Sequence, residues 1–282
     1  MFDGFHAGRV ARRMAEEEVT YFMGVPAMFG LLLREGDATF SHAALPQLRL
    51  AAYGGAPFPA AWVSEIRRRM PQMRMVEVYG LTETHSPATM LYDHEFWRRP
   101  GSVGRAIPCM DLKVVDDAGT EVPVGEPGEL LLKGANVTTG YFDDSAATED
   151  AFVDGWFRTG DLARIDDEGY LFLLDRKKDM IQRGGFKVYG VELEYLLASH
   201  PDVVEAAVVG VPAGIAGEDV VAFLVLHEGS PVTPLDVRHW VAERAADYQV
   251  PRHIRVVAGL PRNPTGKVDK VALRRSETDP AT

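Results

Sequence analysis

The chain has 282 residues, of which 46% are hydrophobic and 25% are charged, as is usual for a globular protein. A formal net charge of −11 argues against a broad nucleic-acid-binding surface. No apolar run reaches the roughly 20 residues of a transmembrane helix, and residues 1–14 lack the features of a signal peptide. Cys109 is the only cysteine, which excludes an intramolecular disulfide and a zinc site built from cysteines. We expect a cytoplasmic protein with two domains, or with one large domain and a small appendage.

The hydrophobic pattern divides the chain into three regions. In the first we predict helical segments and then a strand, over residues 6–19, 24–36, 59–70 and 75–80. The second is β-rich, with strands over residues 111–117, 128–134 and 169–174. A charged cluster at 175–179 precedes an α+β region of two helices (190–200, 233–247) and three strands (205–211, 220–226, 253–259). Residues 274–282 are expected to be disordered.

Two glycine-containing turns follow predicted strands in the first region. The adjacent glycines of YGGAPFP (53–59) let a flat ligand approach the backbone closely, with an ordinary loop as the alternative. In VEVYGLTETHSP (76–87), Glu83 stands between two threonines just beyond a strand. Mg²⁺ takes one or two protein carboxylates and leaves its other positions to phosphate and water, so this segment suits a Mg²⁺–phosphate site. The alternative for Thr82–Thr84 is a helix N-cap.

Three further stretches in the second half of the chain contain candidate polar groups. Asp161, after RTG, is placed to accept hydrogen bonds from ribose hydroxyls, and Arg176 suits ribose or phosphate. A surface turn and a linker salt bridge are the alternatives. The glycine pair in MIQRGGFKVYGVELE (180–194) is predicted to open a helix and present backbone amides, or simply to form a turn. Lys267 follows a Pro-Thr-Gly turn, a frame that a lysine reaching for a phosphate or carboxylate needs and an ordinary surface lysine does not.

The order of these motifs resembles that of the adenylate-forming (AMP-binding) superfamily. The matching stretches are YGLTET, GELLLKG with TTGYFDD, GWFRTGD, DRKKDMIQRGGFKV and PTGK. The resemblance as a whole covers roughly residues 2–274. The run after the arginine resembles the branch of acyl-CoA synthetases, or fatty-acid–CoA ligases. The implied fold class is α/β plus α+β. A truncated large domain (1–175) with a mixed sheet and a β-rich subdomain would precede a hinge (176–179), a small α+β C-terminal domain (180–275) and a tail (276–282).

The resemblance implies an enzyme that joins a carboxylic acid to ATP and then transfers the acyl-adenylate to the thiol of CoA. ATP, Mg²⁺ and CoA are the implied cofactors, and a fatty or aryl acid is the implied substrate. Residues that resemble the ATP- and AMP-binding set are Gly54, Gly55, Ala56, Tyr79, Gly80, Thr82, Asp161 and Arg176. Tyr79 resembles the aromatic that stacks on the base, Thr82 the phosphate contact, and Glu83 the carboxylate associated with Mg²⁺.

The remaining matches concern adenylation, the transfer to CoA and the conformational change between these two steps. Lys267 resembles the lysine that bridges the substrate carboxylate and the α-phosphate, so Lys267, Thr82 and Glu83 form the expected catalytic set. Lys178 stands at the hinge position, and Gly184 and Gly185 match the loop that lines the CoA tunnel. The family more often has proline where Gly190 stands, which we expect to soften the start of that helix without changing the reaction.

One family motif is absent from this sequence. Nothing before Tyr79 resembles the Ser/Thr/Gly-rich phosphate loop that ends in PKG. We therefore expect the N-terminal portion that holds this loop to be missing, an exposed apolar patch where that portion would pack, and impaired adenylation. Two alternatives stay open: a non-catalytic nucleotide-binding remnant or split-enzyme subunit that pairs with a complementary N-terminal chain, and an adenylation domain that loads a carrier protein.

Overall fold

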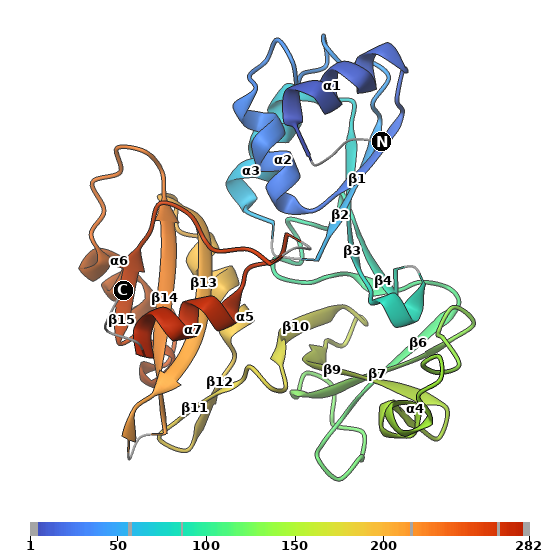
Figure 1. The fold of residues 1–282 in the computed structure, drawn as a ribbon, viewed down its shortest axis with the longest axis vertical. Helices are drawn as coiled ribbons and strands as arrows, with labels where there is room; N and C mark the ends of the chain where they lie inside the picture. The colour runs from blue at the N-terminus through green and yellow to red at the C-terminus, as the bar shows by residue number, and fades with distance from the viewer. Residues whose placement is uncertain (1–4, 56–57, 86, 215–216, 264–265, 279–282) are drawn as a thin grey trace. The chain divides into compact units, whose positions relative to one another are not determined.

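The computed structural model describes residues 5–55, 58–85, 87–214, 217–263 and 266–278 (Figure 1). The chain divides into two compact units. Unit 1 consists of Met1–Asp111, Gly134–Thr139 and Gly169–Leu171, and unit 2 of Leu112–Lys133, Gly140–Glu168 and Phe172–Thr282. Each unit has its own sheets and its own buried residues, so each is described separately.

Unit 1 is built on a five-stranded sheet in the order β1-β2-β3-β4-β5. The strands are β1 (Tyr21–Gly24), β2 (Leu50–Gly54), β3 (Arg74–Tyr79), β4 (Thr89–Tyr92) and β5 (Arg105–Ala106). The first three strands run parallel, and the β3–β4 and β4–β5 pairs are antiparallel. Helix α2 (Pro26–Arg34) joins β1 to β2, and α3 (Ala60–Arg69) joins β2 to β3, as expected for parallel neighbours.

One face of this sheet is covered by three helices. The strand residues on this face pack into one buried cluster with side chains of α1 (Ala7–Glu16), α2 and α3. The cluster includes Phe29, Ile66 and Tyr53, and the rings of Phe29 and Tyr53 meet edge to face. Burial of this many apolar side chains is the main driving force for folding of the unit.

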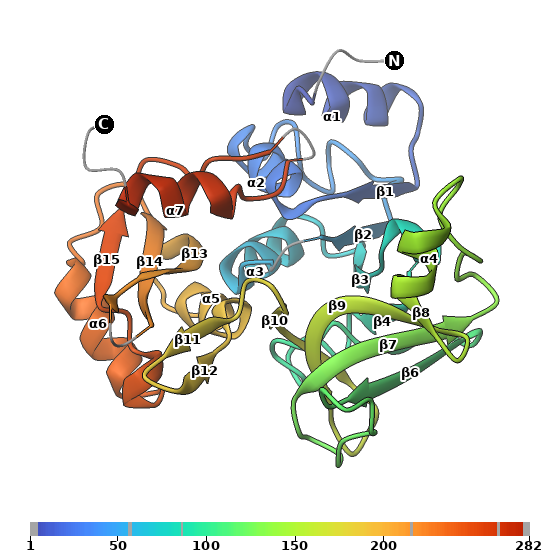
Figure 2. The ribbon, with the colours of Figure 1, turned by 60° about the horizontal axis from the view of Figure 1, so that its bottom comes forward.

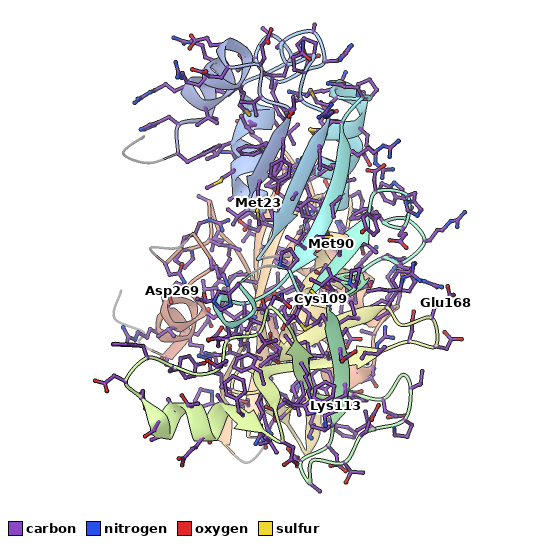
Figure 3. All side chains as sticks on the ribbon, turned by 90° about the vertical axis from the view of Figure 1, so that its right-hand side faces the viewer. Met23, Met90, Cys109, Lys113, Glu168 and Asp269 are labelled. Atoms are coloured by element: carbon purple, nitrogen blue, oxygen red, sulfur yellow. The ribbon has the colours of Figure 1, made fainter. Side chains whose placement is uncertain are left out.

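The opposite face of the same sheet is apolar but partly open. In register, Tyr21 pairs with Leu50 and Met23 pairs with Ala52, so these four side chains share one face. Tyr21 is 49% exposed and Met23 is 57% exposed. Met90, labelled with Met23 in Figure 3, pairs with Val78 and therefore lies on this same face. The exposed apolar side chains on this face belong to β1, whereas Ala52 and Val78 on the same face are buried.

The first part of unit 2 is β-rich, as predicted. Its sheet has the order β10-β9-β7-β6, and a short β8 pairs with β9. The strands are β6 (Met110–Val115), β7 (Gly128–Gly134), β8 (Phe152–Val153), β9 (Trp156–Ile165) and β10 (Leu171–Arg176). Helix α4 (Ser145–Ala151) begins at Asp144, whose carboxylate accepts a hydrogen bond from the backbone N–H of Ala147.

Residues 180–278, called the C-terminal region from here on, form a sheet in the order β13-β14-β15 (Figure 2). The strands are β13 (Val203–Pro212), β14 (Glu218–Leu226) and β15 (His253–Val256), and the hairpin of β11 (Ile181–Arg183) and β12 (Phe186–Val188) precedes them. Alternate residues of β14 pack into two separate clusters, one with α5 (Gly190–Ala198) and α6 (Pro234–Ala242), the other with α7 (Lys270–Thr278). A one-turn 3₁₀ helix, η3 (Asp247–Gln249), precedes β15. The α/β plus α+β fold class is therefore confirmed.

The structure decides between two interpretations and corrects one expectation. Of the two interpretations of Gly184 and Gly185, the turn is confirmed: they form the turn of the β11–β12 hairpin, where their φ angles of 57° and 86° suit glycine, and they do not open a helix. The expected disorder from residue 274 is contradicted by α7, which continues to Thr278. Ion pairs from Arg274 to Asp179 and from Arg255 to Glu277, both at 2.8 Å, hold this helix. Residues 279–282 lie outside the described residues. No helix in the described ranges combines the length and hydropathy needed to cross a bilayer.

Candidate functional site

The loops after β2 and β3 leave the sheet of unit 1 at the same edge. The strands are parallel, and Gly54 at the end of β2 pairs with Val78 near the end of β3. A Cβ on Gly54 would lie 2.1 Å from the carbonyl oxygen of Val78, so close strand packing alone requires glycine here. Gly55 has a φ of 84°, which also favours glycine. Ala56 lies outside the described residues.

The segment after β3 turns sharply into the short 3₁₀ helix η1 (Thr82–Thr84). Tyr79 is only 8% exposed, whereas Gly80 and Thr82 are exposed. The Thr84 hydroxyl accepts a hydrogen bond from the Leu81 N–H at 3.0 Å and donates to the Leu81 carbonyl at 2.9 Å. Thr84 therefore has the local capping role, which leaves Thr82 pointing outward at the edge of the sheet.

Residues that the sequence reasoning missed hold the backbone of this segment. The Asn136 side-chain amide donates to the carbonyl of Thr84 at 2.7 Å, and the N–H of Thr138 donates to the carbonyl of Glu83 at 2.7 Å. The ring of His85 also contacts the carbonyl oxygen of Asn136 at 3.1 Å. Asn136 and Thr138 lie in KGANVTTGY, where the Thr/Gly-rich composition was the available signal. They fix the backbone from which the Glu83 side chain leaves.

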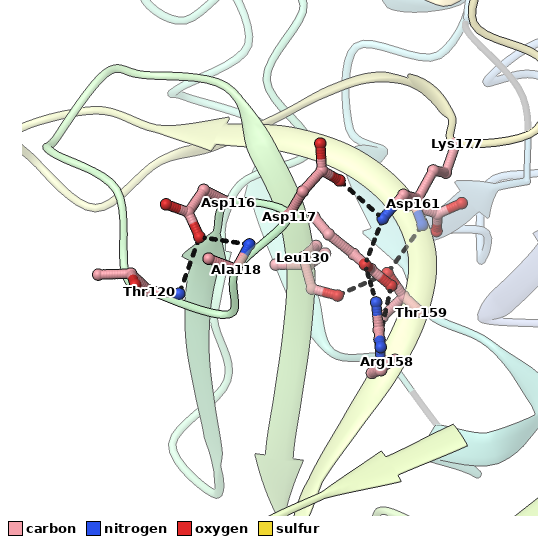
Figure 4. A network of polar contacts seen from close by, with 10 residues as sticks. Asp116, Asp117, Ala118, Thr120, Leu130, Arg158, Thr159, Asp161 and Lys177 are labelled. Atoms are coloured by element: carbon pink, nitrogen blue, oxygen red, sulfur yellow. Dashed lines mark hydrogen bonds and ion pairs between the residues drawn. The ribbon is translucent and has the colours of Figure 1, made fainter. Parts of the chain in front are cut away.

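In unit 2, Asp161 and Arg176 form a direct ion pair. Asp161 lies on β9 and is 6% exposed, and its Oδ1 is 2.8 Å from Nε of Arg176 at the end of β10. The Thr159 hydroxyl accepts from the N–H of Asp161 at 3.0 Å and donates to the carbonyl of Leu130 at 2.8 Å (Figure 4). The linker salt bridge considered as an alternative is therefore present, and it aligns a buried carboxylate with a half-exposed guanidinium.

A second set of charges lies beside this pair and includes the neighbour of the hinge residue. Glu129 on β7 bonds Arg158 at 2.6 Å and Lys177 at 3.2 Å, and Lys177 also reaches Asp117 at 3.1 Å (Figure 4). Burial raises the pKa of Glu129, but the hydrogen bonds from Arg158 and Lys177 outweigh it, so the pKa is lowered overall. Lys178 itself is exposed. The chain is thus anchored up to residue 177 and solvated at the next position.

The Lys267 loop is closed by backbone and amide hydrogen bonds. Asn263 donates its N–H to the Lys267 carbonyl at 2.8 Å, and its side chain accepts from the Lys267 N–H at 3.0 Å. Gly266 has a φ of 83°, which places the following residue at the end of a tight turn. Lys267 is exposed, as are Gly184 and Gly185 in their hairpin. Pro264 and Thr265 lie outside the described residues.

Glu83 is the carboxylate that the sequence suggested for a metal ion. Among the described residues, no group of three or more His, Cys, Asp or Glu side chains is placed to hold a metal ion. Mg²⁺ that is bound mainly through phosphates and water needs only one or two carboxylates. Glu83, half-buried at the edge of the sheet, fits that requirement without further protein ligands.

Comparison with known proteins gives consistent matches over both units. The family model for AMP-binding enzymes matches residues 1–142, and the model for the AMP-binding enzyme C-terminal domain matches residues 192–267. A long-chain-fatty-acid–CoA ligase from Yersinia pestis is 36% identical over 97% of this chain and 48% of its own length. A 2-succinylbenzoate–CoA ligase from Bacillus licheniformis is 36% identical over 94% of this chain and 53% of its own length.

Solved structures agree with the sequence matches. The ATP-bound crystal structure of MatB from Rhodopseudomonas palustris is similar with a TM-score of 0.86 and 34% identity, over 100% of this chain and 55% of that chain. The chain spans about half the length of the curated relatives it matches. The motif order, the fold of both units and these matches together show that the chain belongs to the family of AMP-binding enzymes.

Proposed function

We propose that this chain contributes to an ATP-dependent acid–thiol ligase that forms acyl-CoA from a fatty or aryl carboxylic acid through an acyl-adenylate. The observation that carries the proposal is the shared edge of β2 and β3, where Gly54, Gly55 and residues 79–83 leave the sheet together. Ligands of open α/β sheets bind at the carboxyl ends of the strands. The names of the relatives, which include fatty-acid and aryl-acid CoA ligases, support the class of acid.

In the proposed site the residues of unit 1 bind the nucleotide and its phosphates. The loop of Gly54, Gly55 and Ala56 with Tyr79 and Gly80 forms the adenine side, and the exposed Thr82 hydroxyl donates to a phosphate. Tyr79 has little exposed ring surface, so stacking on the base requires its ring to turn outward. Glu83 would hold Mg²⁺, which supplies positive charge to the phosphates. The hydrogen bond from Thr138 keeps the Glu83 backbone in place for that role.

The residues of unit 2 have their own proposed roles in the two steps. Asp161 accepts from the ribose hydroxyls, and Arg176 both orients Asp161 and contacts the ribose or a phosphate. Lys267 bridges the acid carboxylate and the α-phosphate, where it offsets the repulsion of two anions and the charge that develops on phosphorus. A rotation about Lys178 then replaces the Lys267 loop with the Gly184–Gly185 hairpin, along which CoA enters.

The two half-reactions differ in what they need from this chain. The phosphate-loop motif is absent from the sequence, so we propose that adenylation by this chain alone is weak. Thiol transfer from a preformed acyl-adenylate uses residues that the chain contains. The same absence favours a second candidate, a non-catalytic nucleotide-binding protein or subunit that needs a complementary N-terminal chain. In either case we propose a cytoplasmic setting.

The test measures both half-reactions with the purified chain. One assay supplies oleoyl- or 4-coumaroyl-adenylate with CoA and follows acyl-CoA; the other supplies ATP, Mg²⁺, the acid and hydroxylamine and follows the hydroxamate. We expect acyl-CoA from the first assay. Any hydroxamate in the second should disappear in Lys267→Ala and persist in Lys133→Ala, a matched exposed lysine. Acyl-adenylate binding without acyl-CoA would favour the non-catalytic candidate, and transfer to a carrier protein but not to CoA would favour the carrier-loading alternative.

A further inference from the structure

Three charged side chains to which the sequence analysis gave no role meet within unit 2. Asp175 is the next-to-last residue of β10, Glu194 lies in α5, and Lys270 is the first residue of α7. Asp175 is 4% exposed and Glu194 is 6% exposed. Buried carboxylates need hydrogen bonds or a cation, so the partners of each show what the cluster holds together.

Asp175 links the strand before the hinge to the helix after it. Its Oδ2 accepts a hydrogen bond from the N–H of Gly190 at 2.6 Å, and its Oδ1 accepts from the N–H of Arg176 at 2.7 Å. Gly190 is the first residue of α5, so the carboxylate is bonded to the N-terminus of that helix, where negative charge is stabilised. Asp175 precedes residues 176–179 and Gly190 follows them. A rotation at Lys178 must therefore break this hydrogen bond.

Glu194 and Lys270 connect the same helix to the Lys267 loop. The Lys270 ammonium is 2.7 Å from Oε1 of Glu194, and only 20% of the lysine side chain is exposed. The same Glu194 oxygen accepts from the N–H of Val208 on β13 at 2.8 Å. Because Lys270 begins α7, this ion pair fixes the start of α7 against α5 and the central sheet.

The short segment between Lys267 and Lys270 connects the anchored start of α7 to the loop that carries Lys267. The N–H of Asp269 donates to the carbonyl of Pro261 at 2.8 Å, and the Asp269 carboxylate accepts from the N–H of Ala272 at 3.0 Å. Lys267 is bonded through Asn263, two residues after Pro261. The loop that carries Lys267 is thus closed on itself and attached to the rest of the C-terminal region where Lys270 is anchored.

The pKa shifts of Asp175 and Lys270 agree with both of these groups being ionised near neutral pH. Burial raises the pKa of Asp175 to about 6, and the charge of Lys270 and the two N–H bonds act against that rise. Burial works to lower the pKa of Lys270, but the charges of Glu194 and Asp175 outweigh it, so the pKa is raised. Lys270 is therefore the cation that lets two carboxylates remain buried beside one another.

We propose that Lys270 is a positioning residue: by its ion pair with Glu194 and its charge beside Asp175, it fixes the loop that carries Lys267 and ties α5 to the end of β10 across the hinge. This inference rests on the proposed function, in which Lys267 acts in adenylation. The cluster stabilises one orientation of the hinge, and the Asp175–Gly190 hydrogen bond is the contact that opens when the C-terminal region turns.

The test uses the full chain with Lys270→Met, which keeps length and removes charge, and Lys270→Arg, which keeps the charge. Amide exchange is read at Gly190, in residues 261–269 and in β13 and β14. Lys270→Met removes the ion pair with Glu194 and the charge beside Asp175, and we expect exchange to be about tenfold faster at Gly190 and in the loop, with β13 and β14 unchanged. Lys270→Arg should restore protection, and Lys133→Met serves as the control.

Three results would overturn the inference. Unchanged exchange at Gly190 and the loop in Lys270→Met would show that Lys270 positions neither. A general rise that includes β13 and β14 would show a structural role only, and equal loss in Lys270→Arg would show that charge is not the determinant. Amide exchange can be measured in a chain that does not turn over. A chain inactive in both half-reactions would therefore contradict the proposed function, whereas the exchange data would still decide whether Lys270 positions the loop.

A kinetic readout adds a second criterion where the chain turns over. Lys270→Met is expected to lower hydroxamate formation from ATP about tenfold or more, because Lys267 is no longer held in place. Formation of acyl-CoA from preformed acyl-adenylate should change much less, since the Lys267 loop has left the site in that step. Equal losses in both half-reactions would contradict a role through Lys267.

Discussion

The sheet of unit 1 and the sheet of the C-terminal region differ in how their faces are covered. In the C-terminal region, successive residues of β14 enter two buried clusters, one beneath α5 and α6 and one beneath α7. In unit 1, α1, α2 and α3 cover one face, while the other carries Tyr21 and Met23 at 49% and 57% exposure. Sheets with parallel strands are usually covered on both faces. Both faces of the C-terminal sheet are therefore covered, whereas the second face of the unit 1 sheet is buried at Ala52 and Val78 and exposed at β1.

Two buried carboxylates, Asp175 and Glu77, differ in how the burial of their charge is compensated. Asp175 is buried between two backbone N–H donors and the charge of Lys270, and its pKa rises only to about 6. Glu77 on β3 receives a hydrogen bond from Tyr53 at 3.4 Å and forms no ion pair among the described residues, and burial raises its pKa to about 8. The buried charge of Asp175 is thus compensated by its neighbours, whereas Glu77 avoids burying a charge by staying protonated.

The largest expected effect follows from the double coverage of β14. Leu224 is fully buried beneath α5 and α6, so Leu224→Ala removes apolar contacts and leaves a cavity. We expect the free energy of unfolding of the C-terminal region to fall by about 2–5 kcal/mol. Urea unfolding followed by amide exchange in β13 and β14 measures it. The control is Leu235→Ala at a 56% exposed position of α6, which should change stability by less than about 0.5 kcal/mol; equal effects would refute the packing argument.

The next largest expected effect is the pH dependence of the stability of unit 1, which arises from the buried carboxyl group of Glu77. In the folded state Glu77 keeps its proton up to about pH 8, whereas in the unfolded chain it loses it near 4.5. The native state binds more protons between these values, so unit 1 loses up to about 1.4 kcal/mol of stability per pH unit as the pH rises through that window. Glu77→Gln, which keeps the shape and cannot ionise, should remove this slope.

The measurement for Glu77 is the urea midpoint of unit 1 at several pH values within the window. Glu35→Gln, at an exposed position of the same unit, is the control and should retain the wild-type slope. The Asp175 contribution is confined to lower pH, between 3.8 and about 6, so it does not overlap the upper half of the Glu77 window. A wild-type slope that persists in Glu77→Gln above pH 6 would show that another group is responsible.

The sequence was informative where local pattern and chemistry coincide. Alternating residues predicted β13, β14 and β15, and the glycine turns after β2 and β3 marked the edge where Gly54 and Thr82 lie. The turn at Gly184–Gly185 could not be told from a helix start, because a glycine pair before an amphipathic helix fits both. Helix α7 was missed because its polar end depends on Asp179, which is 95 residues away from Arg274 along the chain.

Contacts between distant segments were not readable from the sequence at all. Asn136 supports the backbone of Thr84 from 52 residues away, and the Thr/Gly-rich composition around it does not show which backbone it contacts. The bond between Asp175 and Gly190 depends on the fold of the hairpin between them. Motif order identified the residues that contact ligand in the proposed function, whereas the residues that hold them in place became visible only in three dimensions.

The smallest expected effect on stability concerns the open face of the unit 1 sheet. Met23 is more than half exposed on the edge strand β1, so Met23→Ser removes few contacts and should change the free energy of unfolding by less than about 0.5 kcal/mol. Apolar dye binding and self-association should nevertheless decrease, because exposed apolar patches cause both. Phe29→Ser on the covered face is the contrast, and it should destabilise unit 1 by several kcal/mol since Phe29 is fully buried. If Met23→Ser proved as destabilising as Phe29→Ser, the face would be covered in solution, and the two sheets would not differ in the way their exposures indicate.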